Sequence, residues 1–154
     1  MLYSSYSASA EYMVEASDKY LEGSFELLRS DKTTISFTSP DEYSSISISG
    51  DSSGQSDVLA FELHGIPANV PKSIASDLSL VFSLFSDEMP SKIMTLDENS
   101  FTLYEDDGSA AVSFSENGTS YSIIYSTATG IPLAINASDE NASLSITIKD
   151  LEVS

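Results

Sequence analysis

His64 is the only histidine of the chain, so it would have to serve as the base of a nucleophilic triad. It directly precedes Gly65, where a strand-like pattern ends. This position is typical of a solvated turn residue. The chain also lacks cysteine, so thiol catalysis and thiolate zinc sites are excluded, and one histidine serves zinc or copper poorly. We therefore predict no catalytic residue, no metal site and no cofactor.

Carboxylates are the other groups that could do chemistry. A glycosidase needs only two of them, flanking the scissile bond. Here they cluster in turn-like segments such as 105–107 and 139–140, and the chain has no tryptophan to stack on a sugar. Calcium is the metal that such loops favour, but neither 51–57 nor 105–108 has the EF-hand spacing. A carboxylate-based hydrolase stays as a third interpretation.

The charge balance excludes several partners. Six basic residues face 24 acidic ones, which gives a formal charge of −18. This charge repels a nucleic-acid backbone and an anionic membrane surface. At 154 residues and 41% hydrophobic content, the chain can bury a core, and we expect one domain over residues 1–154.

Most of the chain alternates apolar and polar residues, which predicts β-strands with one buried face. The segment from Ala8 to Ala16 is the longest example. Short turns separate about ten such segments, and Asn117-Gly118 is the strongest hairpin signal. Because short turns cannot make parallel crossovers, we expect an antiparallel meander. The expected strands cover residues 8–17, 20–29, 33–39, 46–48, 59–63, 93–96, 101–104, 110–114, 121–126, 131–135 and 144–148.

One segment has a helical period instead. Its apolar residues fall on a single helical stripe, with Leu80 and Leu84 beside it, and Pro71 and Pro90 bound it. We predict one amphipathic helix over about residues 72–89. The residues of the stripe are Ile74, Leu78, Val81, Phe82, Phe85 and Met89.

These elements predict a mainly β (α+β) fold: a curved antiparallel sheet that forms a half-barrel or open barrel, with the helix packed on its concave face. Such a helix either completes a filled core or covers an apolar cavity, and ligand sites are concave and mostly apolar. The predicted ligand-binding residues are Leu78, Val81, Phe82, Phe85, Phe37, Phe61 and Phe101.

Two short segments resemble a known family. Residues Tyr121 to Ile135 form a strand, a turn and a Gly130-Ile131-Pro132-Leu133 step, and Ile35 to Pro40 forms a strand ending in proline. Together with the mid-chain helix, they resemble the lipoprotein-carrier (LolA-like) superfamily of bacterial envelope proteins. The resemblance implies a non-enzymatic protein exported to the cell envelope, with a lipid anchor upstream of Met1 as one route of attachment.

The leading interpretation is thus a cell-envelope protein that binds an apolar or lipid-like ligand between helix and sheet. The alternative is a protein-interaction or scaffold module with a filled core, whose partner binds a sheet edge. Neither interpretation involves nucleic acid. The oligomeric state is left open.

Overall fold

The computed structural model describes residues 5–44, 46–53, 56, 58–71, 76–86, 89 and 101–153. For residues 76–80 and residue 101 it describes the backbone only. The described chain forms one 11-stranded antiparallel sheet, a helix α1 (Ser76–Phe85) and a short 3-10 helix η1 (Asp41–Tyr43). The strands are β1 (Tyr6–Ala16), β2 (Lys19–Arg29), β3 (Lys32–Ser39), β4 (Ile46–Asp51), β5 (Val58–Leu63), β6 (Ile66–Pro71), β7 (Phe101–Asp106), β8 (Ser109–Glu116), β9 (Thr119–Ser126), β10 (Pro132–Ser138) and β11 (Ala142–Val153).

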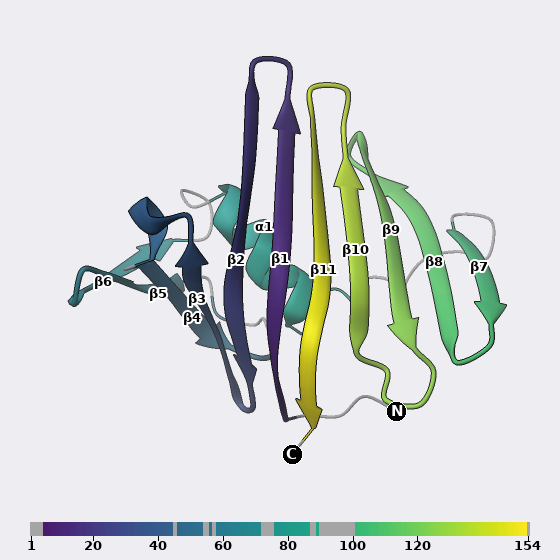
Figure 1. The fold of residues 1–154 in the computed structure, drawn as a ribbon, viewed down its shortest axis with the longest axis horizontal. Helices are drawn as coiled ribbons and strands as arrows, with labels where there is room; N and C mark the ends of the chain where they lie inside the picture. The colour runs from purple at the N-terminus through teal and green to yellow at the C-terminus, as the bar shows by residue number, and fades with distance from the viewer. Residues whose placement is uncertain are drawn as a thin grey trace.

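The strand order is β6-β5-β4-β3-β2-β1-β11-β10-β9-β8-β7, so the first and last strands meet in the middle of the sheet. Figure 1 shows β1 and β11 side by side at the centre. The chain runs outward from β1 to the β6 edge, passes through α1, and returns inward from the β7 edge to β11. All neighbours pair antiparallel, as the short turns predict.

The two faces of the curved sheet differ in chemistry. On the concave face, alternate residues of the strands between the two edges are apolar and mostly buried, as in Tyr6, Ala8 and Ala10 of β1. The convex face carries polar pairs between strands, such as the Ser9 hydroxyl 3.2 Å from a Glu26 carboxylate oxygen. The burial pattern therefore follows the period-two sequence, and only one face needs cover.

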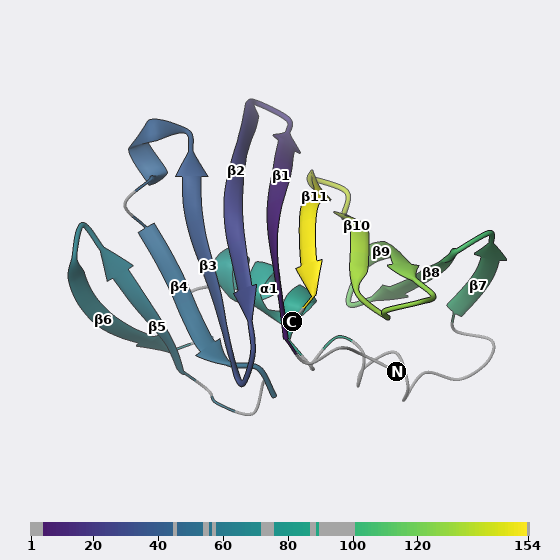
Figure 2. The same ribbon diagram turned by 60° about the horizontal axis from the view of Figure 1, so that its bottom comes forward.

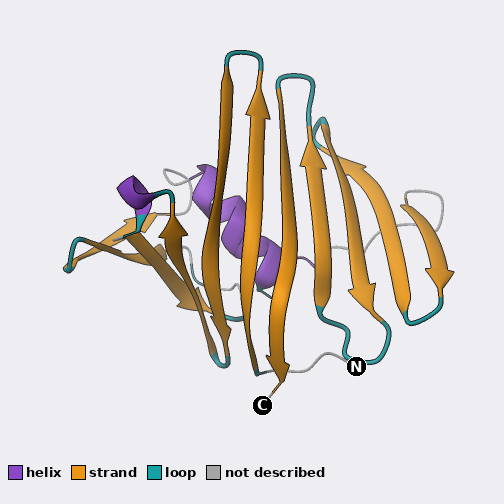
Figure 3. Cartoon of the chain, viewed as in Figure 1, coloured by secondary structure: helices purple, strands orange, loops and turns teal. Residues whose placement is uncertain are grey.

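Helix α1 lies across the concave face, behind β2, β1 and β11 in the view of Figure 1 and again in the tilted view of Figure 2. Figure 3 shows how small the helical content is beside the sheet. The described helix covers Ser76–Phe85, which is shorter than the predicted 72–89. Residues 72–75, 87 and 88 of that prediction, and the strand expected at 93–96, lie outside the described residues.

Strand β6 is absent from our sequence expectations because Pro67 was interpreted as the end of the preceding strand. The structure corrects this: residues 66–71 pair with β5. Pro67 lies opposite Glu62, next to the hydrogen-bonded pair Leu63–Ile66 that closes the turn. Hydrogen-bonded and non-hydrogen-bonded pairs alternate along the ladder. The nitrogen atoms of Pro67 and Pro71 therefore both point away from β5. Proline is tolerated there, at an edge strand.

Two turns have the backbone expected of two-residue hairpins. Asn117 and Gly118 have φ of 52° and 82°, as a type I′ turn requires, which confirms the predicted hairpin. His64 and Gly65 have the same pair of values. His64 is exposed in that turn, as its sequence context predicts.

Candidate ligand site on the concave face

The side chains of the last part of α1 anchor the helix to the sheet. Phe82, Leu84 and Phe85 are buried, and so is Met89 beyond the helix end. The ring of Phe85 meets the ring of Phe25 on β2 edge-on, with centroids 6.0 Å apart. Aromatic pairs prefer this arrangement. The predicted apolar stripe therefore faces the sheet over its described part.

Phe25 belongs to an aromatic group on the concave surface of the sheet. Its ring lies 6.1 Å from that of Tyr12 and 6.0 Å from that of Phe37. The Tyr12 hydroxyl donates to the carbonyl oxygen of Ser39 at 3.2 Å, so its polar atom is satisfied, while burial raises its pKa. Gly23 makes room for this ring, because a Cβ at Gly23 would lie 2.5 Å from the Tyr12 hydroxyl oxygen. Gly23 is thus a site of close approach between β2 and the Tyr12 side chain.

Phe82 fills a second apolar cluster over β4 and β5. It packs with Ile48, Leu59 and Phe61. Gly50 allows this contact, because a Cβ there would lie only 2.8 Å from the Phe82 Cζ atom. Half-buried Phe37 packs against both this cluster and the one around Phe85.

Arg29 lies under the C-terminal end of α1 and is only 9% exposed. Its Nη1 atom donates to the main-chain carbonyl oxygen of Phe85. A cation is favourable at a helix C-terminus, where the last carbonyl oxygens lack partners within the helix. Our sequence interpretation missed this residue. Arg29 follows Phe25 and Leu27 at every second position of β2, and this alternation could have placed it on the buried face.

The predicted ligand residues are only partly brought together. Five of the seven lie between α1 and strands β3 and β5: Phe37, Phe61, Val81, Phe82 and Phe85. The backbone of Phe101 lies opposite Phe114, at the other edge of the sheet, and the side chain of Leu78 lies outside the described residues. Phe82 and Phe85 are each 1% exposed and serve the core. Half-buried Val81 and Phe37 keep some accessible surface.

A further set of apolar side chains, which sequence reasoning missed, lies in register on the concave face, and four of its six members are only half-buried. Val14 lies opposite both Leu21 and Leu144, and the register continues through Ala137 and Tyr121 to Phe114. The result is one unbroken apolar row across β2, β1, β11, β10, β9 and β8. We call it the concave row: Leu21, Val14, Leu144, Ala137, Tyr121 and Phe114. Its last two rings are stacked, with centroids 4.9 Å apart.

Tyr125 lies on the same face, two residues beyond Ile123 on β9. Burial, with a smaller effect of Tyr6, raises the pKa of Tyr125 to about 12. The phenol is therefore neutral over the whole physiological range.

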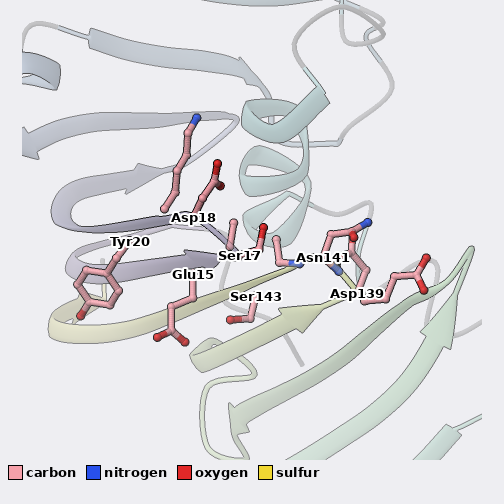
Figure 4. Close-up of a pocket in the computed structure, with 11 residues that line it drawn as sticks. Glu15, Ser17, Asp18, Tyr20, Asp139, Asn141 and Ser143 are labelled. Carbon is pink, nitrogen blue, oxygen red and sulfur yellow. Dashed lines mark hydrogen bonds between the residues drawn. The ribbon is translucent and has the colours of Figure 1, made fainter.

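A hollow of about 720 Å³ opens between the tips of the β1–β2 and β10–β11 hairpins (Figure 4). Its lining is polar and includes Glu15, Asp18 and Asp139. The Asp139 Oδ1 atom already accepts the backbone N–H groups of Asn141 and Ala142, at 2.8 and 2.9 Å, so this carboxylate holds its turn. Within the described ranges, no group of three His, Cys, Asp or Glu residues is placed to hold a metal ion.

Comparison with known proteins gives a fold and no closer relationship. No family model and no curated protein matches the sequence. Among solved structures, a LolA superfamily protein from Nitrosomonas europaea is 8% identical with a TM-score of 0.58, covering 100% of this chain and 88% of that one. The fold is LolA-like.

Two more structures share this LolA-like fold. A conserved protein from Thermus thermophilus is 9% identical with a TM-score of 0.63, covering 99% of this chain and 80% of that one. A domain described as an outer membrane lipoprotein-sorting protein, from Vibrio parahaemolyticus, is 10% identical with a TM-score of 0.50, covering 97% and 85% of the two chains. The resemblance seen in the sequence is confirmed at the level of the fold. No helix among the described residues is long and apolar enough to cross a membrane.

Proposed function

We propose that this protein is a non-enzymatic cell-envelope protein that binds an apolar or lipid-like ligand on the concave face of its sheet. The observation that carries the proposal is the concave row. Its side chains are apolar in register over neighbouring strands, and four of them, Leu21, Val14, Leu144 and Tyr121, are only half-buried. A convex face rich in polar pairs gives such a ligand no comparable surface.

The dimensions of the row suit an acyl chain. Strands in a sheet lie about 4.8 Å apart, so six neighbouring strands span roughly 24 Å from Leu21 to Phe114. This length is comparable to that of an extended long acyl chain. Burying apolar surface is worth about 25 cal/mol per Å², and it needs no charged partner. The ligand class is therefore one with a long apolar part.

The envelope location rests on the LolA-like fold and on the sorting function named for the Vibrio parahaemolyticus domain. A formal charge of −18 disfavours direct binding of the domain to an anionic membrane, so a lipid anchor is the proposed route of attachment. A lipid found on protein purified from a bacterial envelope fraction, detected by native mass spectrometry, would support both the ligand and the location. Protein that carries no lipid under these conditions would count against the carrier function.

A fluorescent fatty-acid probe tests the site itself. The double substitution Val14→Thr with Leu144→Thr makes the middle of the row polar while keeping residues that favour strands. The matched control makes the same kind of change at Met13 and Leu28, which are exposed on the convex face. We expect the row variant to weaken probe binding about tenfold or more and the control to leave it unchanged. Equal binding by both variants would contradict the site.

A scaffold module with a filled core is the second candidate. It is favoured by the burial of Phe82 and Phe85, which pack closely against residues of the sheet. This function predicts no probe binding by the unmodified protein. It also predicts stability changes with no accompanying effect on a ligand.

A further inference from the structure

The open sheet has two edges, and they differ in what they offer to another polypeptide. Strand β6 forms one edge and β7 the other, and no described residue pairs with the outer side of either. An unpaired edge presents a row of N–H and C=O groups that can accept an additional strand. The identity of the outward-facing residues decides whether that row is usable.

The register of the two hairpins identifies these residues. Asp106 pairs with Ser109 across a two-residue turn, so this pair exchanges hydrogen bonds and the outward groups of β7 belong to Phe101, Leu103 and Glu105. Leu63 pairs with Ile66 in the same way, so the outward groups of β6 belong to Pro67, Asn69 and Pro71.

The β6 edge is therefore blocked by its sequence. Two of its three outward residues are prolines, which have no N–H to donate and which natural proteins use to protect sheet edges. The β7 edge has no proline, and all three of its outward residues keep a donor and an acceptor. It also exposes Leu103 by 54% and Tyr104 by 65%, one on each face of the strand.

The charge around β7 selects the kind of strand that can bind. Residues 101–148 contain no Lys, Arg or His. Glu105, Asp106 and Asp107 lie in β7 and its turn and are all exposed. A second copy of this chain would bring another formal charge of −18, which disfavours pairing of two β7 edges.

We propose that the outer edge of β7 is a docking site for an extended, basic segment of a partner protein, which adds to the sheet as a twelfth strand. The backbone of Phe101, Leu103 and Glu105 provides the hydrogen bonds. Leu103 and Tyr104 contact apolar side chains of the added strand. The three carboxylates at and beside the strand end attract its Lys or Arg side chains. This proposal is independent of the ligand on the concave face.

Amide hydrogen exchange of the free protein is the first test. The amides of Thr102 and Tyr104 bond to β8 and should be protected, whereas those of Leu103 and Glu105 face outward and should exchange much faster. Addition of a peptide of about eight alternating Val and Lys residues should slow exchange at Leu103 and Glu105 about tenfold or more. Protection of these two amides before any peptide is added would overturn the proposal.

Peptide affinity of two proline variants is the second test. Leu103→Pro removes an outward donor of β7 without touching the ladder to β8, and Asn69→Pro makes the same change on β6. We expect Leu103→Pro to weaken binding about tenfold and Asn69→Pro to leave it within about twofold. A peptide with Glu in place of Lys should not bind. Equal loss in both variants, binding of the Glu peptide, or dimerisation of the protein through β7 in sedimentation experiments would each contradict the proposal.

Discussion

Arg29 Nη1 donates a hydrogen bond to the carbonyl oxygen of Phe85 and so joins a buried residue of β2 to the last residue of α1. A hydrogen bond from a charged donor contributes about 1.5–3 kcal/mol when it is buried. We expect Arg29→Met to lower the free energy of unfolding by about this amount in urea titrations. The matched control is Lys149→Met, which removes an exposed cation 3.8 Å from a Glu11 carboxylate oxygen. It should cost less than about 1 kcal/mol. Equal effects would show that Arg29 does not hold the helix.

Gly50 sets the distance between α1 and β4. Gly50→Ala would place a methyl group 2.8 Å from Phe82 Cζ, so the helix or the ring must move. We expect a loss of about 1–3 kcal/mol in the free energy of unfolding, as overpacked cores show. Phe82→Leu shortens the opposing side chain. In the Gly50→Ala background it should cost clearly less than it does alone, giving a favourable coupling energy in a double-mutant cycle. Additive losses would mean that the two sites are not in contact.

Phe85 and Val81 differ in burial, although both were predicted to contact a ligand. Phe85→Ala removes a fully buried ring and should cost about 3–5 kcal/mol. Val81→Ala removes a half-buried side chain and should cost about 1 kcal/mol or less. Thermal denaturation measures both. A small loss for Phe85→Ala, combined with altered binding of the fatty-acid probe, would instead place this ring on the wall of a ligand cavity.

The raised pKa of Tyr125 should lower the stability of the folded protein at alkaline pH. Its pKa is about 12 in the folded protein and 10.0 ordinarily, so the unfolded chain releases this proton first as pH rises. The folded state then binds more protons, and stability falls between about pH 10 and 12, by at most about 2–3 kcal/mol. Tyr125→Phe should flatten this part of the stability curve measured by urea unfolding. An equally steep fall between about pH 10 and 12 in this variant would contradict the assignment to Tyr125.

The sequence predicts most of the fold because alternation identifies the buried face of each strand without knowledge of its neighbours. It could not supply β6, since Pro67 indicates the end of a strand unless its edge position is known. It could not supply the concave row either. Val14 and Leu144 become neighbours only through the β1–β11 pairing, which joins opposite ends of the chain. Arg29 was missed for a related reason. Alternation along β2 places it on the concave face, but only the position of α1 gives it a partner, the carbonyl oxygen of Phe85.

The β1–β11 pairing also divides the molecule into two meanders of hairpins, each built from neighbouring segments of the chain. Hairpins close short loops, whereas this central pairing must close a loop through almost the whole described chain, at a larger entropic cost. Non-local pairing of this kind slows folding. Until it forms, each meander carries an extra unpaired edge at β1 or β11. In an incompletely folded chain, the unpaired edges of β1 and β11 are therefore the most exposed to pairing with another copy, although they lie at the centre of the finished sheet.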